Sequence, residues 1–217
     1  MGRFPGAVFQ NRISPSFAGF VDAEVQTLVD RGCVVKWTDV RAPGVPPRPR
    51  LLMVLSVEET KTCLIYDARP LNKRCRGIPF SMDTVARVAN VASWGCYTTS
   101  LDDISAFHLI LLRPSPWPLF GFSYGGTDYC WCVLPFRFSL SPWCYHTPSE
   151  AKAAFLRSKG MRALAYLDDS WVSYFQASHG LAVREQWLAA GEATHVAMLV
   201  SFFAVSSCPP EVWLPAD

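Results

Sequence analysis

Long apolar runs are missing from this sequence, which has no stretch of about 18 apolar residues, the length of a membrane-spanning helix. The longest late candidate, residues 196–205, is too short and contains Ser201. The first residues also lack the apolar core of a secretory signal. We therefore expect an intracellular protein, of the cytoplasm or the nucleus, that does not work at a membrane.

Zinc-binding spacing is missing too. None of the eight cysteines belongs to a Cys-x-x-Cys pair, and no cysteine–histidine spacing is typical of a zinc site. Most of the cysteines lie inside apolar stretches, which favours reduced core residues over a disulfide framework. The sequence thus argues against both a zinc module and a disulfide-stapled scaffold.

Charge is scarce, at 18% of the 217 residues with a net charge of +2, while half of the residues are hydrophobic. This composition suits one large or two small folded domains rather than a disordered chain. The net charge alone does not indicate a nucleic-acid-binding protein. However, residues 41–76 contain eight basic and only three acidic residues. That local excess suits a polyanionic partner, with an ordinary solvated surface as the alternative.

The apolar pattern mixes strands and helices without regular βαβ alternation, which predicts an α+β fold with an antiparallel sheet. A capping-box pattern at Thr147-Pro148-Ser149-Glu150 predicts a further helix that begins there. Helices are expected near residues 18–30, 81–91 and 181–190, and strands over residues 33–37, 51–57, 62–66, 96–101, 119–124 and 129–134.

The most informative stretch is Tyr166-Leu167-Asp168-Asp169, where two carboxylates stand between two apolar, partly aromatic runs. This pattern predicts a hairpin with a tight acidic turn, and one interpretation is that the aspartates only make that turn. A third carboxylate, Asp102, follows the strand expected over residues 96–101, where it could equally cap the strand end. If the strands are neighbours, the three carboxylates converge, and a divalent cation would offset their repulsion. Two Mg²⁺ ions in such a site can assist phosphoryl transfer.

Four segments in this order resemble the motifs of reverse transcriptases, and most closely those of retrotransposons. No single motif is specific, but four in order over about residues 17–175 make a strong resemblance. The segments are residues 64–72 (Leu-Ile-Tyr-Asp-Ala-Arg-Pro-Leu-Asn), 100–108 (Ser-Leu-Asp-Asp-Ile-Ser-Ala-Phe-His), 134–142 (Leu-Pro-Phe-Arg-Phe-Ser-Leu-Ser-Pro) and 166–169 (Tyr-Leu-Asp-Asp).

The resemblance implies an RNA-directed DNA polymerase that adds dNTPs to a primer 3′-OH on an RNA or DNA template. Its catalytic residues and ligands for two Mg²⁺ ions, or Mn²⁺, would be Asp102, Asp168 and Asp169. The spacing to Ala106-Phe107 selects Asp102 rather than its neighbour Asp103. The implied nucleotide-binding residues are Lys61, Arg69, Phe107 and Phe136.

Two of these residues keep an alternative explanation. Phe107 would be the steric gate that excludes a 2′-OH, or else a core aromatic residue. A gate of this kind also argues against a third possibility, an RNA-templated RNA polymerase. Arg69 would lie near the triphosphate, or else be structural.

The chain departs from the family pattern at several positions. Cys63 stands where the family has an arginine that contacts the triphosphate, and Arg137 replaces a glycine. Pro148 falls inside the helix that the family begins at Ser141-Pro142, and no lysine follows the acidic hairpin. These departures support the alternative hypothesis of a catalytically degenerate retroelement fragment, at most a nucleic-acid-binding remnant.

The resemblance also implies a right-hand polymerase palm, an antiparallel sheet with packed helices, together with fingers. We expect residues 1–95 to form an N-terminal segment and fingers. Residues 96–175 would form the palm core, with a fingers-like hairpin near residues 113–134. Residues 176–217 would be a truncated end of the palm, too short for a thumb.

Overall fold

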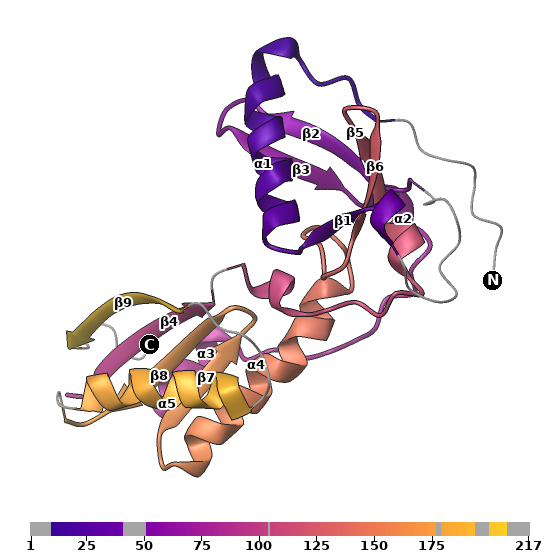
Figure 1. The fold of residues 1–217 in the computed structure, drawn as a ribbon. Coiled ribbons are helices and arrows are strands. Elements are labelled where there is room, and N and C mark those ends of the chain that lie inside the picture. Colours follow the sequence, from indigo (N-terminus) through magenta and orange to yellow (C-terminus); the bar gives the residue numbers. More distant parts are fainter. Residues whose placement is uncertain (1–9, 41–50, 104, 177–178, 194–199, 208–217) are drawn as a thin grey trace, which may run out of the picture. The chain divides into compact units, whose positions relative to one another are not determined.

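The computed structural model describes residues 10–40, 51–103, 105–176, 179–193 and 200–207 (Figure 1). The chain has a mixed, α+β architecture, as the sequence predicts. It divides into two compact units. Unit 1 contains residues 1–77 and 110–141, and unit 2 contains residues 78–109 and 142–217.

Unit 1 contains two small antiparallel sheets, with strand orders β1-β6-β5 and β2-β3. The β5–β6 hairpin turns at Gly125-Gly126, where both residues have positive φ (57° and 75°), as a tight hairpin turn requires. The main elements are α1 (Ala18–Asp30), β1 (Val34–Lys36), β2 (Val54–Glu58), β3 (Cys63–Asp67), α2 (Arg69–Asn72), β5 (Gly121–Tyr124) and β6 (Thr127–Trp131). Short 3-10 helices cover Pro15–Phe17, Trp37–Asp39 and Trp117–Phe120.

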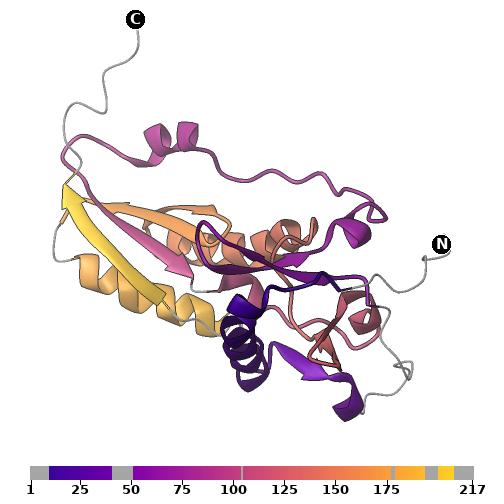
Figure 2. The same ribbon diagram turned by 90° about the horizontal axis from the view of Figure 1, so that it is seen from above.

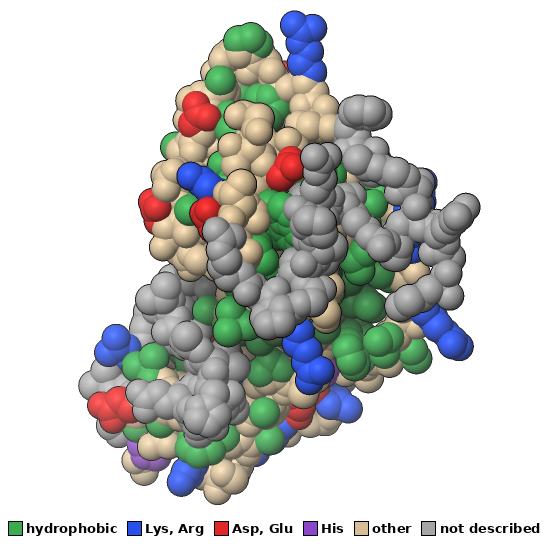
Figure 3. Space-filling view, turned by 45° about the vertical axis from the view of Figure 1, so that its right-hand side comes forward, with side chains coloured by type: hydrophobic (Ala, Val, Ile, Leu, Met, Phe, Trp, Pro, Cys, Tyr) green, Lys and Arg blue, Asp and Glu red, His purple; other side chains and the backbone are tan. Residues whose placement is uncertain are grey.

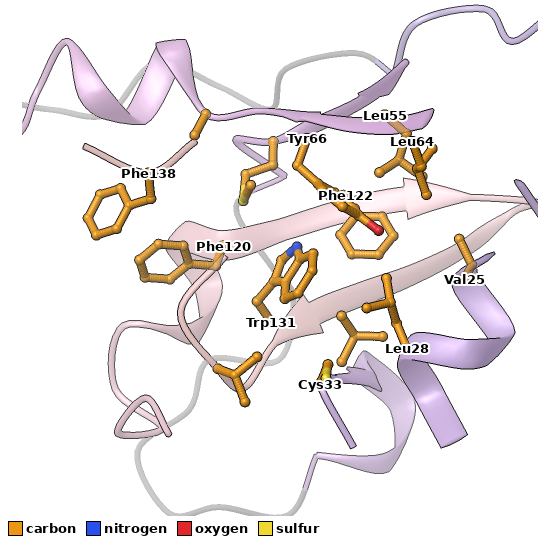
Figure 4. Packing of buried hydrophobic residues seen from close by; sticks show 14 of the residues in the cluster. Val25, Leu28, Cys33, Leu55, Leu64, Tyr66, Phe120, Phe122, Trp131 and Phe138 are labelled. Atoms are coloured by element: carbon orange, nitrogen blue, oxygen red, sulfur yellow. The ribbon is translucent and has the colours of Figure 1, made fainter. Parts of the chain in front are cut away.

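Aromatic rings fill the core of unit 1. Figure 4 shows Tyr66 and Phe122 beside Trp131, with Val25 and Leu28 of α1 approaching from the other side. The rings of Tyr66 and Trp131 meet edge to face at 4.6 Å between centroids. Such pairs add to the stabilisation that burial alone provides. The aromatic strands of the sequence therefore form the core that holds β3 and β6 together.

Unit 2 is built on a four-stranded antiparallel sheet of order β7-β8-β4-β9. Helix α5 covers one face of the sheet and α3 lies on the other (Figure 2). The elements are α3 (Val85–Val91), β4 (Tyr97–Asp103), a 3-10 helix (Ala106–Leu109), α4 (Ser141–Ser158), β7 (Arg162–Tyr166), β8 (Asp169–Tyr174), α5 (His179–Ala193) and β9 (Val200–Ser207).

The core of unit 2 lies on the α4 and α5 side of this sheet. Leu101 and Val172 from the strands pack there with Leu156 of α4 and Trp187 of α5. Strand β9 pairs with β4, although the sequence did not predict a strand after residue 190. Among the described residues, none of the helices combines the length and hydrophobicity required to cross a bilayer.

Most predicted elements are found within a few residues of their expected bounds. Helix α3 begins at Val85 rather than near residue 81, and α5 begins at His179 rather than at residue 181. Seven cysteines in the described regions are free thiols, and four of these are buried, whereas Cys63 is exposed. Cys208 lies outside the described residues.

The predicted helix start at Thr147 is wrong, because α4 runs without a break from Ser141 to Ser158 with Pro148 inside it. Tertiary contacts decide this start. The buried Ser141 hydroxyl donates a hydrogen bond to the Pro135 carbonyl oxygen (2.8 Å), which anchors the helix six residues before the capping-box pattern. The capping box therefore lies inside the helix, and its proline removes one backbone donor there.

The division into units differs from the boundary expected at residue 95. Residues 78–95 lie in unit 2, where α3 packs near β7. The carboxylate of Asp83, just before α3, accepts a hydrogen bond from the backbone N–H of Ala165 (3.2 Å). This contact explains why the segment belongs with the sheet that carries the acidic hairpin.

Candidate active site

The acidic hairpin is formed by β7 and β8, and its turn is made by Leu167 and Asp168. Tyr166 and Asp169 are the last paired residues before the turn. Leu167 has φ of 54°, a left-handed conformation that non-glycine residues seldom adopt. A residue held in this conformation indicates that the surroundings impose the turn.

Strand β4 lies beside β8 and brings a third aspartate to the hairpin. Asp102 and Asp169 are direct Cα partners across the β4–β8 pair. Directly paired residues of an antiparallel sheet point to the same face, whereas neighbours along a strand point to opposite faces. Asp102 and Asp169 therefore share one face, and Asp103 points to the other face, toward α4 and α5.

Two hydrogen bonds hold the turn against the rest of unit 2. The backbone N–H of Asp103 donates to the carbonyl oxygen of Asp168 (3.0 Å). The hydroxyl of the buried Ser149, on α4, donates to the carbonyl oxygen of Leu167 (2.5 Å). Both turn residues are thus fixed through their backbone carbonyl groups.

On the other face of the sheet, Asp103 takes part in a buried polar cluster that also contains Tyr145 and Lys152 of α4. The Lys152 ammonium and the Tyr145 hydroxyl both donate to Oδ2 of Asp103, and all three residues are almost fully inaccessible to solvent. The ammonium also lies 4.3 Å from the centre of the Trp187 ring. A buried ion pair of this kind is costly to break, because either partner alone would be an uncompensated charge.

Residues 145, 149 and 152 follow one another at spacings of four and three along α4, so they lie on one face of the helix. This polar stripe contacts both β4 and the hairpin turn. The sequence reasoning missed all three residues. Their pattern, a tyrosine, a serine and a lysine at helical spacing, is visible in the sequence. A helix that begins at Thr147, however, would not contain Tyr145.

The pKa values of Asp168 and Asp169 reflect their burial first and the neighbouring carboxylates second. Burial raises the pKa of Asp168, and the nearby aspartate carboxylates raise it further. Burial also raises the pKa of the more exposed Asp169, with a contribution from Asp102. Burial lowers the pKa of Lys152, which the Asp103 carboxylate opposes. The site thus disfavours negative charge on Asp168 and Asp169, an effect that a bound cation would reverse.

No group of three or more His, Cys, Asp or Glu residues is arranged to hold a metal ion among the residues that the structure describes. The predicted convergence of Asp102, Asp168 and Asp169 on Mg²⁺ is therefore not seen as a formed site. The donor set itself fits the ion, since carboxylate oxygens are its preferred protein ligands. The raised pKa values of Asp168 and Asp169 point the same way.

The proposed gate residue, Phe107, lies in the 3-10 helix that follows β4. Its ring meets the buried Tyr145 ring edge to face, with centroids 5.9 Å apart, and the side chain is half-buried. One side of Phe107 is thus packed against the polar stripe of α4. This geometry fits a partly exposed platform better than a fully enclosed core residue.

The other predicted nucleotide-binding residues belong to unit 1. Lys61 is exposed in the turn between β2 and β3, and Phe136 is exposed in the loop before α4. Arg69 forms a fork with Asp67, in which Nε and Nη2 donate to the carboxylate at 2.6 to 3.0 Å. The ion pair favours the structural explanation of Arg69, because much of its hydrogen-bonding capacity is used within the chain. On the face in Figure 3, basic side chains stand singly rather than in one patch.

Asn72, from the first motif of the resemblance, connects it to the loop before α4. Its Nδ2 donates to the Arg137 carbonyl oxygen (2.8 Å), and its Oδ1 accepts from the Ser139 N–H (2.9 Å). Arg137 has φ of 63°, so it keeps the backbone conformation that a glycine would adopt freely. Asn72 therefore fixes a loop that has a left-handed backbone at a residue other than glycine.

Comparison with known proteins gives relatives only at low identity. No family profile matches the chain. The chain is 24% identical over 165 residues to the Pro-Pol polyprotein of Simian foamy virus type 3 (strain LK3), which covers 76% of this chain and 14% of the polyprotein. The identity to the Simian foamy virus type 1 polyprotein is also 24%, over 13% of its length. The chain thus spans about one seventh of these relatives.

Solved structures agree with this result. The fold matches a foamy viral protease-reverse transcriptase in complex with an RNA/DNA hybrid with a TM-score of 0.72 at 17% identity, over 91% of this chain and 25% of that one. A complex of that protein with double-stranded DNA gives a TM-score of 0.71 at 17% identity, over 91% and 32%. Native Prototype Foamy Virus Protease-Reverse Transcriptase gives 0.69 at 18% identity, over 92% and 25%.

The fold is therefore that of a retroviral polymerase-related domain. More particularly, it is similar to the fold of part of the foamy virus protease-reverse transcriptase. The relatives found are viral, so the retrotransposon origin suggested by the motifs stays a prediction.

Proposed function

We propose that the chain is the catalytic part of an RNA-directed DNA polymerase, with unit 2 as palm and unit 1 as fingers. The observation that carries the proposal is the pairing of Asp102 with Asp169 on adjacent strands, with Asp168 at the turn between β7 and β8. Turn aspartates alone would not require a partner on another strand. The arrangement brings carboxylates from two strands to one end of a sheet, and carboxylates so placed could hold the two metal ions of a phosphoryl-transfer site.

Asp102, Asp168 and Asp169 would hold Mg²⁺ or Mn²⁺ in this proposal. Bound there, the ions would stabilise the negative charge that develops on the transferred phosphoryl group. The chain's own contribution is to fix the carboxylates in place. Ser149 and the backbone of Asp103 hold the turn, and the buried Asp103–Lys152 pair fixes the end of β4 against α4. Such support matters because a catalytic group displaced by about 1 Å can lose most of its effect.

Phe107 would act as the steric gate beneath the sugar and select dNTPs over rNTPs. Its half-buried ring, held by contact with Tyr145, supports this role, because a gate has to resist displacement. Lys61 and Phe136, both exposed in unit 1, would contact the incoming nucleotide. Arg69 would contribute less to nucleotide binding than the resemblance implies, since its guanidinium forms an ion pair with Asp67.

An RNA or DNA template-primer would be the partner of the polymerase. The solved relatives in complex with double-stranded DNA and with an RNA/DNA hybrid support this proposal. The basic excess in residues 41–76 gives it a second, independent support.

Primer extension tests the proposal. The full chain is given an RNA template, a DNA primer, dNTPs and Mg²⁺, and is compared with Asp168→Asn and Asp102→Asn. We expect dNTP incorporation that either substitution reduces by several orders of magnitude. Asp128→Asn, which removes a carboxylate from unit 1, is the matched control and should retain activity.

The second candidate is a degenerate polymerase fold that still binds nucleic acid. Cys63 and Arg137 favour it, because the family pattern has an arginine and a glycine at these positions. Incorporation no higher than that of Asp168→Asn, with retained binding of the template-primer, would establish this candidate and refute the first.

A further inference from the structure

Unit 1 contains a hollow that is lined by Arg69 and by Arg137, a residue to which the resemblance gives no role. Its volume is about 570 Å³, a size suited to a small polar ligand. Strands β2 and β3, the start of α2 and the loop before α4 form its walls. The polar side chains that line it are Asn11, Ser56, Asp67, Arg69 and Arg137.

Two guanidinium groups face one carboxylate in this hollow. Arg69 forks onto Asp67 with three hydrogen bonds, so the charges of that pair are largely balanced. Arg137 has no ion pair with any residue in the described parts of the chain. Both guanidinium groups lower the pKa of Asp67, with the hydrogen bonds from Arg69 as the largest cause. The hollow therefore keeps a net positive charge, and Arg137 carries it.

The backbone holds Arg137 at this hollow at a cost in free energy. Its φ of 63° is unfavourable for any residue with a Cβ atom. Asn72 bonds the carbonyl of Arg137 and the N–H of Ser139, so the loop cannot relax without losing both bonds. An arginine kept in a conformation that suits glycine is the kind of local strain that accompanies a functional side chain.

Strand parity connects Arg137 to another position. Along β3, Leu64 and Tyr66 point into the core, whereas Cys63, Ile65 and Asp67 point to the opposite face. Ile65 and Asp67 line the hollow. A side chain at position 63 therefore projects from the face of β3 that borders the hollow, and a long cation there could reach it.

We propose that this hollow binds phosphate groups, and that Arg137 is their main ligand, in place of a cation at position 63. Arginine suits this role because its planar fork matches two phosphate oxygens. The phosphates could belong to a nucleoside triphosphate or to a nucleic-acid backbone. The site lies wholly within unit 1 and does not require the aspartates of unit 2. This inference deepens the proposed function, on which it rests for the kind of ligand, and binding without metal tests it separately from catalysis.

Direct binding in metal-free buffer tests the site without catalysis. The full chain is titrated with inorganic tripolyphosphate, with dTTP and with a short oligo(dT). The affinity for each ligand is compared between wild type and four variants. The variants are Arg137→Gly, Cys63→Arg with Arg137→Gly, Asp168→Asn and Arg113→Ala. Glycine is chosen at position 137 because the backbone conformation suits it, so the fold is retained. Arg113→Ala removes an exposed positive charge of unit 1 outside the hollow.

Loss of a charge-assisted contact predicts that Arg137→Gly weakens binding of tripolyphosphate about tenfold. The added Cys63→Arg should restore most of it, and Asp168→Asn and Arg113→Ala should leave it within about twofold. A parallel loss of affinity for dTTP identifies a nucleoside triphosphate as the source of the phosphates. A parallel loss of affinity for oligo(dT) identifies a nucleic-acid backbone as the source. Either result supports the site. Unchanged affinity in Arg137→Gly, or an equal loss in Arg113→Ala, refutes it. A double variant as weak as Arg137→Gly refutes the exchange between positions 63 and 137.

Discussion

Asp102 and Asp169 are direct partners on two antiparallel strands, although 67 positions separate them in the sequence. Their side chains share one face of the sheet, with Asp168 at the adjoining turn. Asp103, one residue from Asp102, points the other way into a buried cluster. The two neighbouring aspartates of β4 thus have different environments, and substitutions can separate their roles.

Asp168→Asn should stabilise the metal-free chain near neutral pH. Because the folded-state pKa of Asp168 is raised, its ionisation penalises the folded state as pH rises above the usual carboxyl range. Asparagine removes that penalty, which we expect to be roughly 0.5 kcal/mol for a half-exposed group. Thermal unfolding across pH measures it: the difference from wild type should vanish at acid pH and shrink when Mg²⁺ binds the native state. A pH-independent difference would contradict the electrostatic cause.

Lys152→Met should destabilise unit 2 by about 3–5 kcal/mol, because it leaves the Asp103 carboxylate buried without its cation. The double variant with Asp103→Leu should recover most of the loss, since an apolar pair of similar volume can replace a buried ion pair. Chemical denaturation measures both. Lys159→Met, at an exposed lysine just after the end of α4, is the control and should change little. A double variant no more stable than Lys152→Met would argue against a paired cluster.

Ser149→Ala should loosen the acidic turn. It removes the hydrogen bond to the Leu167 carbonyl, with an expected loss of about 1 kcal/mol in stability. In an active chain, kcat should fall while the KM for dNTP stays nearly constant, because the variant displaces the carboxylates rather than the nucleotide pocket. Ser158→Ala, which removes an exposed bond to the Phe155 carbonyl, is the control. Equal kinetics for the two variants would remove the positioning role.

Pro148→Ala should stabilise the chain, because it restores a backbone donor inside α4 and removes the ring from the helix interior. The expected gain is about 1–3 kcal/mol, less than the full cost of an interior proline because the native helix has adapted to it. Pro142→Ala is the control, since proline is well tolerated in the first turn of a helix. A loss of stability in Pro148→Ala would show that the proline is required for the local geometry.

Arg137→Gly should raise stability by about 1 kcal/mol, because glycine adopts a positive φ without steric cost. The same substitution is expected to weaken phosphate binding. Opposite changes in melting temperature and affinity would be the signature of a strained residue retained for binding. Arg137→Ala is the control, which removes the guanidinium but keeps the strain, so it should lose affinity without gaining stability.

Local rules were sufficient for many elements. The spacing of apolar residues predicted α1. The Gly-Gly pair and the Tyr-Leu-Asp-Asp pattern predicted two hairpins, because turn chemistry and alternation act over a few residues. The same rules failed at α4, where they placed the start at the capping box. Ser141 and Pro135 decide that start through a contact that only the loop before α4 can make.

The candidate site divides in the same way. The sequence by itself identified Asp102, Asp168 and Asp169 as candidate site residues, because their motifs are local. It also predicted the α+β class. Only the tertiary structure decided that Asp102 pairs with Asp169 while Asp103 is buried against Lys152, since strand register and helix packing set both. The tertiary structure also decided that Arg69 forms an ion pair with Asp67 and that Arg137 lines a hollow. Side-chain partners far apart in the sequence depend on the packing of whole elements, which no local pattern contains.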